Sequence, residues 1–407
     1  MSLEQSYINL YQAHRESLIA TSPEVMNTMR DEAIGVFAQK GFPTRKVEDY
    51  RYVDVPQAFD GKDTYMMPLP TLPLNSNKQS VISLNDESLL RRYYAKTADS
   101  EDAITALNTA FSHECICIHV CKNQTLDRPI ELTDTFTSDE DQMEHKRVLI
   151  VLEEGASASI MLRYAANNKM HILTTQVVEV FVGDNAHLEM YELEETHTSC
   201  TRFNQVYIQV GRYATVKHNN ITLFNGLTRN TIKACLKGEY SEVTLNGCVM
   251  ADKSQVVDNN TLIRHEVPNC TSHELYKYVV DEQAVGAFAG KVYVAEGAQK
   301  TVSEEVNQNI CASNDARMYT QPMLEIYADD VKCSHGSTVG KLDEMALFYM
   351  RQRGIPLAEA RMLLMQAFVG QVIDEIPIAP LRDRLHIMIE QRLKGELDKC
   401  VGCARCK

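Results

Sequence analysis

A cysteine and a histidine lie two residues apart in the segment Cys333-Ser334-His335-Gly336. They follow a run of β-branched and aromatic residues at 324–327, so we expect them on or beside an extended segment. Side chains two residues apart project to the same side of a strand. A thiolate and an imidazole both ligate iron, zinc and iron–sulfur clusters. The pair is therefore a candidate metal or cluster site; a buried thiol beside a hydrogen-bonded histidine is the alternative.

Three further cysteines, Cys400, Cys403 and Cys406, follow one another at the C-x2-C-x2-C spacing. This spacing is ferredoxin-like and compact enough to surround one cluster or metal ion. Only three thiols are present, so a fourth ligand has to come from elsewhere or the position stays open. The alternative is a solvated tail with free thiols.

A third group alternates along a predicted strand: Cys115, Cys117, His119 and Cys121. Neighbours on one strand face are about 6.6–7 Å apart, which is too far for several of them to share one ion. Small cysteines on a half-buried strand explain the pattern equally well. The P-loop, Gly-x-Gly-x-x-Gly and His-Glu-x-x-His motifs are all absent from the sequence, so we expect a protein that is not itself an enzyme.

The composition of the chain limits the kinds of partner that it can bind. The chain has 407 residues, with 41 basic and 55 acidic side chains and a formal charge of −14, which argues against nucleic-acid binding. It contains no long apolar run and starts with a polar segment, so we expect neither a membrane span nor a secretory signal, and a cytoplasmic location. In that compartment, 12 cysteines indicate thiols or metal ligands more than a disulfide framework.

The elements that position these residues show a repeat. Gly155, Gly183, Gly211 and Gly238 each begin a Gly-x-x-small segment, and they follow one another at a nearly constant interval in the twenties. Such a period, made of strands and turns, leaves no room for a crossover helix and indicates units that stack on one another. It predicts a parallel β-helix with one repeat per coil, with a β-sandwich of coincidental spacing as the alternative.

Helical patterns flank the repeat. We predict an N-terminal helical region and linker at 1–80, the β-helix at 81–339, a C-terminal helical region at 340–398 and a cysteine-rich tail at 399–407. The segment Leu357–Ile373 carries an apolar stripe at helical spacing. A terminal helix of this kind has to pack either on the end of the β-helix or on another chain.

The segment 333–344 (CSHGSTVGKLDE) resembles the SufB/SufD family of iron–sulfur cluster assembly scaffolds, and SufD more than SufB. Upstream segments agree, namely 286–291 (GAFAGK), 307–309 (NQN), 322–326 (PMLEI) and 41–46 (GFPTRK). The chain departs from the family pattern where Tyr50 replaces the usual tryptophan and in the tail cysteines, which the resemblance does not support.

The resemblance implies a right-handed parallel β-helix between two helical regions. It also implies a non-catalytic scaffold that pairs with a SufB-like paralogue, with a homodimer in isolation as the alternative. By the same resemblance, we expect an iron–sulfur cluster to form transiently at that interface, with His335 and nearby Cys333 contributed by this chain, and no tightly bound cofactor. A SufC-like ABC ATPase is expected to dock on the C-terminal helices, whose apolar stripe includes Leu357, Leu363, Leu364 and Phe368.

Two other functions remain open from the residues themselves. One is a β-helix carbohydrate-active enzyme, which would need a groove lined by acids and bases; the repeats show no stacked row of carboxylates. The other is a thiol-based metal store centred on Cys400, Cys403 and Cys406.

Overall fold

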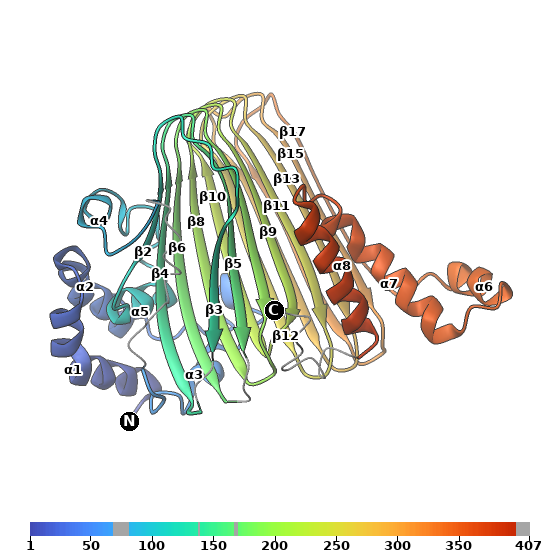
Figure 1. The fold of residues 1–407 in the computed structure, drawn as a ribbon, viewed down its shortest axis with the longest axis horizontal. Coiled ribbons are helices and arrows are strands. Elements are labelled where there is room, and N and C mark those ends of the chain that lie inside the picture. Colours follow the sequence, from blue (N-terminus) through green and yellow to red (C-terminus); the bar gives the residue numbers. More distant parts are fainter. Residues whose placement is uncertain (68–80, 137–138, 167–169, 396–407) are drawn as a thin grey trace.

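The computed structural model describes residues 1–67, 81–136, 139–166 and 170–395, and its core is a parallel β-helix (Figure 1). From β3 onward, successive strands alternate between two sheets, and each strand pairs in parallel with the equivalent strand of the next coil. The pair β1 and β2 is antiparallel. The predicted parallel β-helix is therefore confirmed.

The first sheet has the order β1-β2-β4-β6-β8-β10-β12-β14-β16 and the second the order β17-β15-β13-β11-β9-β7-β5-β3. The strands of the first sheet are β1 Ile82–Leu84, β2 Ile116–Val120, β4 Gln142–Leu152, β6 Ile172–Val182, β8 Cys200–Val210, β10 Leu227–Leu236, β12 Val256–His265, β14 Val285–Val294 and β16 Arg317–Ile326. The strands of the second sheet are β3 Ile130–Phe136, β5 Ser157–Ala166, β7 His187–Glu195, β9 Thr215–Phe224, β11 Glu242–Ala251, β13 Thr271–Val280, β15 Val302–Cys311 and β17 Lys332–Gly340.

The repeated glycines lie in the turns that lead from the first sheet to the second. A Cβ atom on Gly238 would lie 2.0 Å from the backbone nitrogen of Arg212 in the preceding coil, so the stacking requires glycine there. The strand register corrects the first repeat interval, which the sequence analysis took from Gly155 to Gly183. Ser157 pairs with His187, so the first coil is longer than that interval. Gly155 is equivalent to Asn185, not to Gly183; both have positive φ angles, 69° and 58°.

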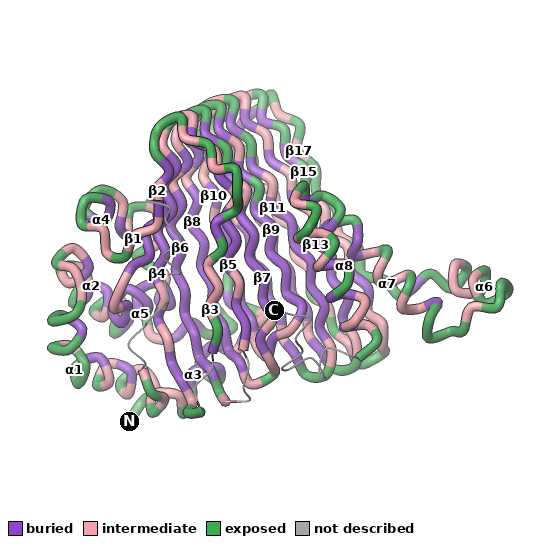
Figure 2. The backbone as a smooth tube through the Cα atoms, in the orientation of Figure 1, coloured by how far each residue is buried: buried purple, intermediate pink, exposed green. Residues whose placement is uncertain are grey.

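The lumen of the β-helix is apolar along part of its wall and polar along the rest. Aliphatic side chains from both sheets form one continuous core, and Figure 2 shows buried residues along the strands. Much of the polar part is internally paired: Glu192 lies 3.0 Å from His218 Nε2 and accepts hydrogen bonds from Asn204. Inward-facing positions in this lumen hence carry paired polar groups as well as core residues.

Helices cover both outer faces. The N-terminal helices are α1 Leu3–Thr21, α2 Glu24–Lys40, the 3-10 turn Glu48–Tyr50, α3 Val55–Phe59, α4 Glu87–Tyr93 and α5 Ala103–Phe111. They pack on the first sheet, where α5 contacts β4 and β6. The helices α4 and α5 fall inside the 81–339 range, between β1 and β2.

The C-terminal helices are α6 Glu344–Gln352, α7 Leu357–Ile373 and α8 Ala379–Leu393. The helix α7 has the bounds predicted from the sequence and packs on β11 and β13 of the second sheet. The helix α6 projects away from the body and has no buried residue (Figures 1 and 2). Within the described ranges, every helix is too short or too polar to cross a bilayer.

Candidate functional site

Cys333 and His335 lie on β17, the last strand of the second sheet. Their partners in register are Ser303 and Glu305 of β15, which are buried positions that face the lumen. By the alternation of strand faces, Cys333 and His335 point to that same side. His335 is nevertheless exposed, because no described coil follows β17 to cover it. The imidazole therefore stands at the open end of the β-helix.

Cys333 has a different environment. It is half-buried and packs against the small apolar cluster of Val292, Val294, Ala298 and Ala328. Burial raises the pKa of the Cys333 thiol, so the protonated form is favoured at neutral pH. Of the two side chains predicted as a pair, His335 is the more accessible from solvent.

The end of the β-helix is a continuous open edge. The strands β16 and β17 terminate the two sheets, and Thr320 of β16 is hydrogen-bonded to Ser337 of β17 at 2.5 Å. Large side chains on and beside this edge are exposed, including Tyr319, Tyr327 and Val339. Unpaired strand edges are templates for pairing with another chain unless they are covered or charged. The geometry thus presents His335 on a surface suited to a partner.

The N-terminal region reaches the same edge. The ring of Tyr52 stacks on Tyr319 at 5.1 Å, and its hydroxyl group donates a hydrogen bond to Gln321. Sequence reasoning did not identify this contact, because it joins residues 269 positions apart. The open edge is therefore supported on its outer side by the segment that follows α2.

The described residues alone do not assemble a metal site. Among them, no group of three or more His, Cys, Asp or Glu side chains is close enough to hold an ion. In the described part, His335 and Cys333 therefore do not belong to a preassembled group of three or more such side chains.

The cysteine row on β2 is divided between environments. Cys115 and Cys117 are buried in an apolar cluster with Leu149 and Val151, beneath α4. His119 Nε2 lies 3.1 Å from a Glu153 carboxylate oxygen, and Cys121 is exposed. This arrangement fits small core side chains on a half-buried strand. The tail with Cys400, Cys403 and Cys406 lies outside the described residues.

The predicted docking residues on α7 divide into two sets. Leu357 and Leu363 are exposed, whereas Leu364 and Phe368 pack against the outer face of the second sheet. The ammonium group of Lys277 lies 4.4 Å from the centre of the Phe368 ring. The first set is available to a partner and the second anchors α7 to the β-helix.

Sequence reasoning missed the most exposed apolar side chains of this region, which lie on α6. They are Met345, Phe348 and Tyr349, with 74%, 57% and 57% of their surface exposed. The helix itself was predictable, but that its apolar residues face solvent depends on how α6 projects from the body.

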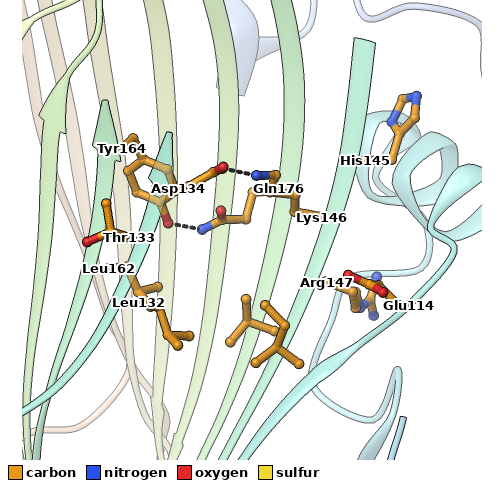
Figure 3. A pocket seen from close by; sticks show the side chains of 12 residues that line it. Glu114, Leu132, Thr133, Asp134, His145, Lys146, Arg147, Leu162, Tyr164 and Gln176 are labelled. Carbon is orange, nitrogen blue, oxygen red and sulfur yellow. Dashed lines mark hydrogen bonds and ion pairs between the residues drawn. The ribbon is translucent and has the colours of Figure 1, made fainter. Parts of the chain in front are cut away.

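A pocket of about 50 Å³ lies near the opposite, N-terminal end of the lumen (Figure 3). Lys146 of β4 is paired with Asp134 of β3, and Gln176 donates a hydrogen bond to Tyr164. Burial lowers the pKa of Lys146 to about 7. The Lys146–Asp134 pair thus joins the two sheets across the first coil.

Comparison with known proteins places this architecture in a family. A family model described as "SUF system FeS cluster assembly, SufBD core domain" matches residues 135–368. A second, "SufBD protein N-terminal region", matches residues 1–83 and 79–132. The chain belongs to the SufBD family of SUF-system iron–sulfur cluster assembly proteins, and the resemblance found in the sequence is confirmed.

Relatives include proteins named SufD. The iron–sulfur cluster assembly protein SufD of Escherichia coli is 28% identical over 381 residues, which cover 87% of this chain and 90% of that protein. SufD of Bacillus subtilis is 26% identical over 313 residues, covering 75% and 71%. A SufBD family protein of Synechocystis is 28% identical over 331 residues, covering 79% and 70%.

Proposed function

We propose that this chain is a non-catalytic, SufD-type scaffold subunit that pairs with a SufB-like paralogue through the β16–β17 edge. His335 then becomes a ligand to an iron–sulfur cluster that is assembled at the interface and passed on. The observation that carries this proposal is the exposure of His335 on the lumen-facing side of the last edge strand. A cytoplasmic location, as expected from the sequence, is part of the same proposal.

The geometry supports a division of the cluster ligands between two chains. At this edge the chain offers the accessible imidazole of His335, with the half-buried thiol of Cys333 two residues away. A cluster needs more ligands than these, so the paralogue would supply the others. A cluster held across a seam is released when the seam opens, which suits a transient cargo. A second copy of this chain could occupy the same edge when the paralogue is absent.

The ATPase docking site in this proposal is the exposed apolar surface of α6 and α7. This surface consists of Met345, Phe348, Tyr349, Leu357 and Leu363. Because Leu364 and Phe368 fix α7 to the second sheet, a movement imposed on α6 would be transmitted to the β-helix. Nucleotide states that bind this surface differently would then favour an open or a closed seam.

The test is His335→Ala in a complex reconstituted anaerobically with the SufB-like chain, the ATPase, iron and sulfide. We expect the complex to form normally and the cluster yield, read by visible absorbance, to fall at least severalfold. The control is His273→Ala, which removes a partly exposed histidine from the outer face of β13. An unchanged cluster yield with His335→Ala, in an intact complex, would contradict the proposal.

A further inference from the structure

Two buried carboxylates lie directly behind the exposed histidine. In the register of the second sheet, Glu274 of β13 pairs with Glu305 of β15, which pairs with His335 of β17. Neighbouring strands are about 4.8 Å apart, so the two carboxylates occupy adjacent coils on the same side of the lumen. Glu274 is 3% exposed and Glu305 is 0% exposed. The column ends at the open edge of the molecule.

These carboxylates differ from the other acidic groups of the lumen. None of the four carboxylate oxygens of Glu274 and Glu305 has a hydrogen-bond partner, whereas Glu192 accepts hydrogen bonds from Asn204. Burial raises the pKa of both unpaired carboxylates, and the charge of Glu274 raises that of Glu305 further. The Thr261 hydroxyl opposes this rise at Glu274, but no hydrogen bond of ordinary geometry joins the two. Unpaired acids in a protein interior are costly and rare, so this pair needs a physical reason.

The surrounding wall is shaped around Glu305. Gly290 faces it from β14, and a Cβ atom at that position would lie 2.5 Å from Glu305 Oε1 and 2.8 Å from the end of the Phe288 ring. The space that holds the carboxylate therefore exists because residue 290 has no side chain. Only the last coil separates this space from the open end, where His335 is exposed.

We propose that Glu274 and Glu305 form a binding site for one small divalent cation, one coil inside the open end of the β-helix. Paired carboxylates supply the hard oxygen ligands that Mn²⁺ and Fe²⁺ accept. A cation between the two would satisfy oxygens that the protein leaves unpaired. His335 is not counted in the site, since the described residues contain no preassembled group of three ligands.

Only the biological use of the bound metal rests on the proposed function. If His335 ligates a cluster at the seam, a ferrous ion bound one coil behind it is held close to where iron is consumed. Binding itself requires only the two carboxylates, so the site and the assembly role can fail separately.

The experiment uses the full chain with its three tail cysteines replaced by serine, so that tail thiols do not take up metal. Mn²⁺ is the probe, because it prefers oxygen ligands. Titration is followed by the electron paramagnetic resonance signal of free Mn²⁺. We expect one Mn²⁺ per chain and a rise in melting temperature. Glu305→Gln and Glu274→Gln, which keep the side-chain shape, should each weaken binding at least tenfold.

Two controls make the result specific. Glu304→Gln removes an exposed carboxylate from the outer face of the same strand and should leave Mn²⁺ affinity unchanged. His335→Ala should also keep Mn²⁺ affinity within about twofold while losing cluster yield in the reconstituted complex. No bound Mn²⁺ and no rise in melting temperature in the parent chain would overturn the proposal. Retained affinity in a folded Glu305→Gln or Glu274→Gln chain would overturn it too.

Discussion

Phe348→Ala should separate partner binding from folding. Phe348 lies on α6, is 57% exposed and belongs to a helix with no buried residue. A phenylalanine buries about 200 Å² when it is fully covered, so docking of the ATPase can remove about 110 Å² of this ring from water. At about 25 cal/mol per Å², that area corresponds to about 2–3 kcal/mol of binding free energy. The dissociation constant should then rise roughly 30- to 150-fold.

The matched variant is Phe368→Ala on α7. Phe368 is partly buried and packs on the outer face of the second sheet beside Lys277, so its loss should lower the free energy of unfolding by about 1–3 kcal/mol. Phe348→Ala should leave that free energy within about 0.5 kcal/mol of the parent value. The two side chains are chemically identical and differ only in which surface they meet.

The assays are isothermal titration of the ATPase into each variant and urea unfolding followed by circular dichroism. The reasoning is refuted if Phe348→Ala binds the ATPase within twofold of the parent chain. It is also refuted if Phe348→Ala unfolds as easily as Phe368→Ala, because α6 would then be part of the packed body.

Three further predictions concern the coils, the tail and pH. Gly238→Ala should lower the free energy of unfolding in urea by about 2 kcal/mol or more, because its Cβ would clash with the backbone of the preceding coil. Gly297→Ala is the control and should lower it little, because a Cβ there would have nothing within 4 Å. Equal losses in the two variants would contradict the stacking argument. Removing residues 399–407 should lower the iron, zinc and sulfide content of the purified chain, and equal contents would exclude a metal role for the tail. Burial lowers the pKa of His145 to about 3, because the charged imidazolium is disfavoured in the interior. The contribution of the neutral imidazole to the stability of the folded state is therefore complete above the unfolded pKa of about 6.5, and it is lost as pH falls below that value. Between pH 6.5 and 4.5 the parent chain should lose about 2 kcal/mol more stability than His145→Gln, and parallel pH curves would count against this assignment.

Local patterns in the sequence were sufficient for the architecture. The regular return of a glycine turn predicted the β-helix because each coil repeats the same two strands and turns. The helix Leu357–Ile373 was predictable to the residue from its apolar spacing. The segment around Cys333 and His335 was sufficient for the family, since it is a contiguous motif that needs no structure to recognise.

Tertiary structure decided which residues meet. The coils differ in length, and the one from Thr271 to Val302 is longer than the one from Thr215 to Glu242, so spacing along the chain does not determine which side chains stack. For this reason the first repeat was aligned out of register, and the column of Glu274, Glu305 and His335 was not seen.

The same limit applies to surfaces. An apolar stripe indicates that a helix packs against something, but not which of its residues meet the protein's own sheet and which are left for a partner. Leu364 and Phe368 turn inward and Leu357 and Leu363 outward because α7 lies across β11 and β13 at one particular angle. That angle depends on the shapes of both packed surfaces, and strands far away in the sequence supply one of them.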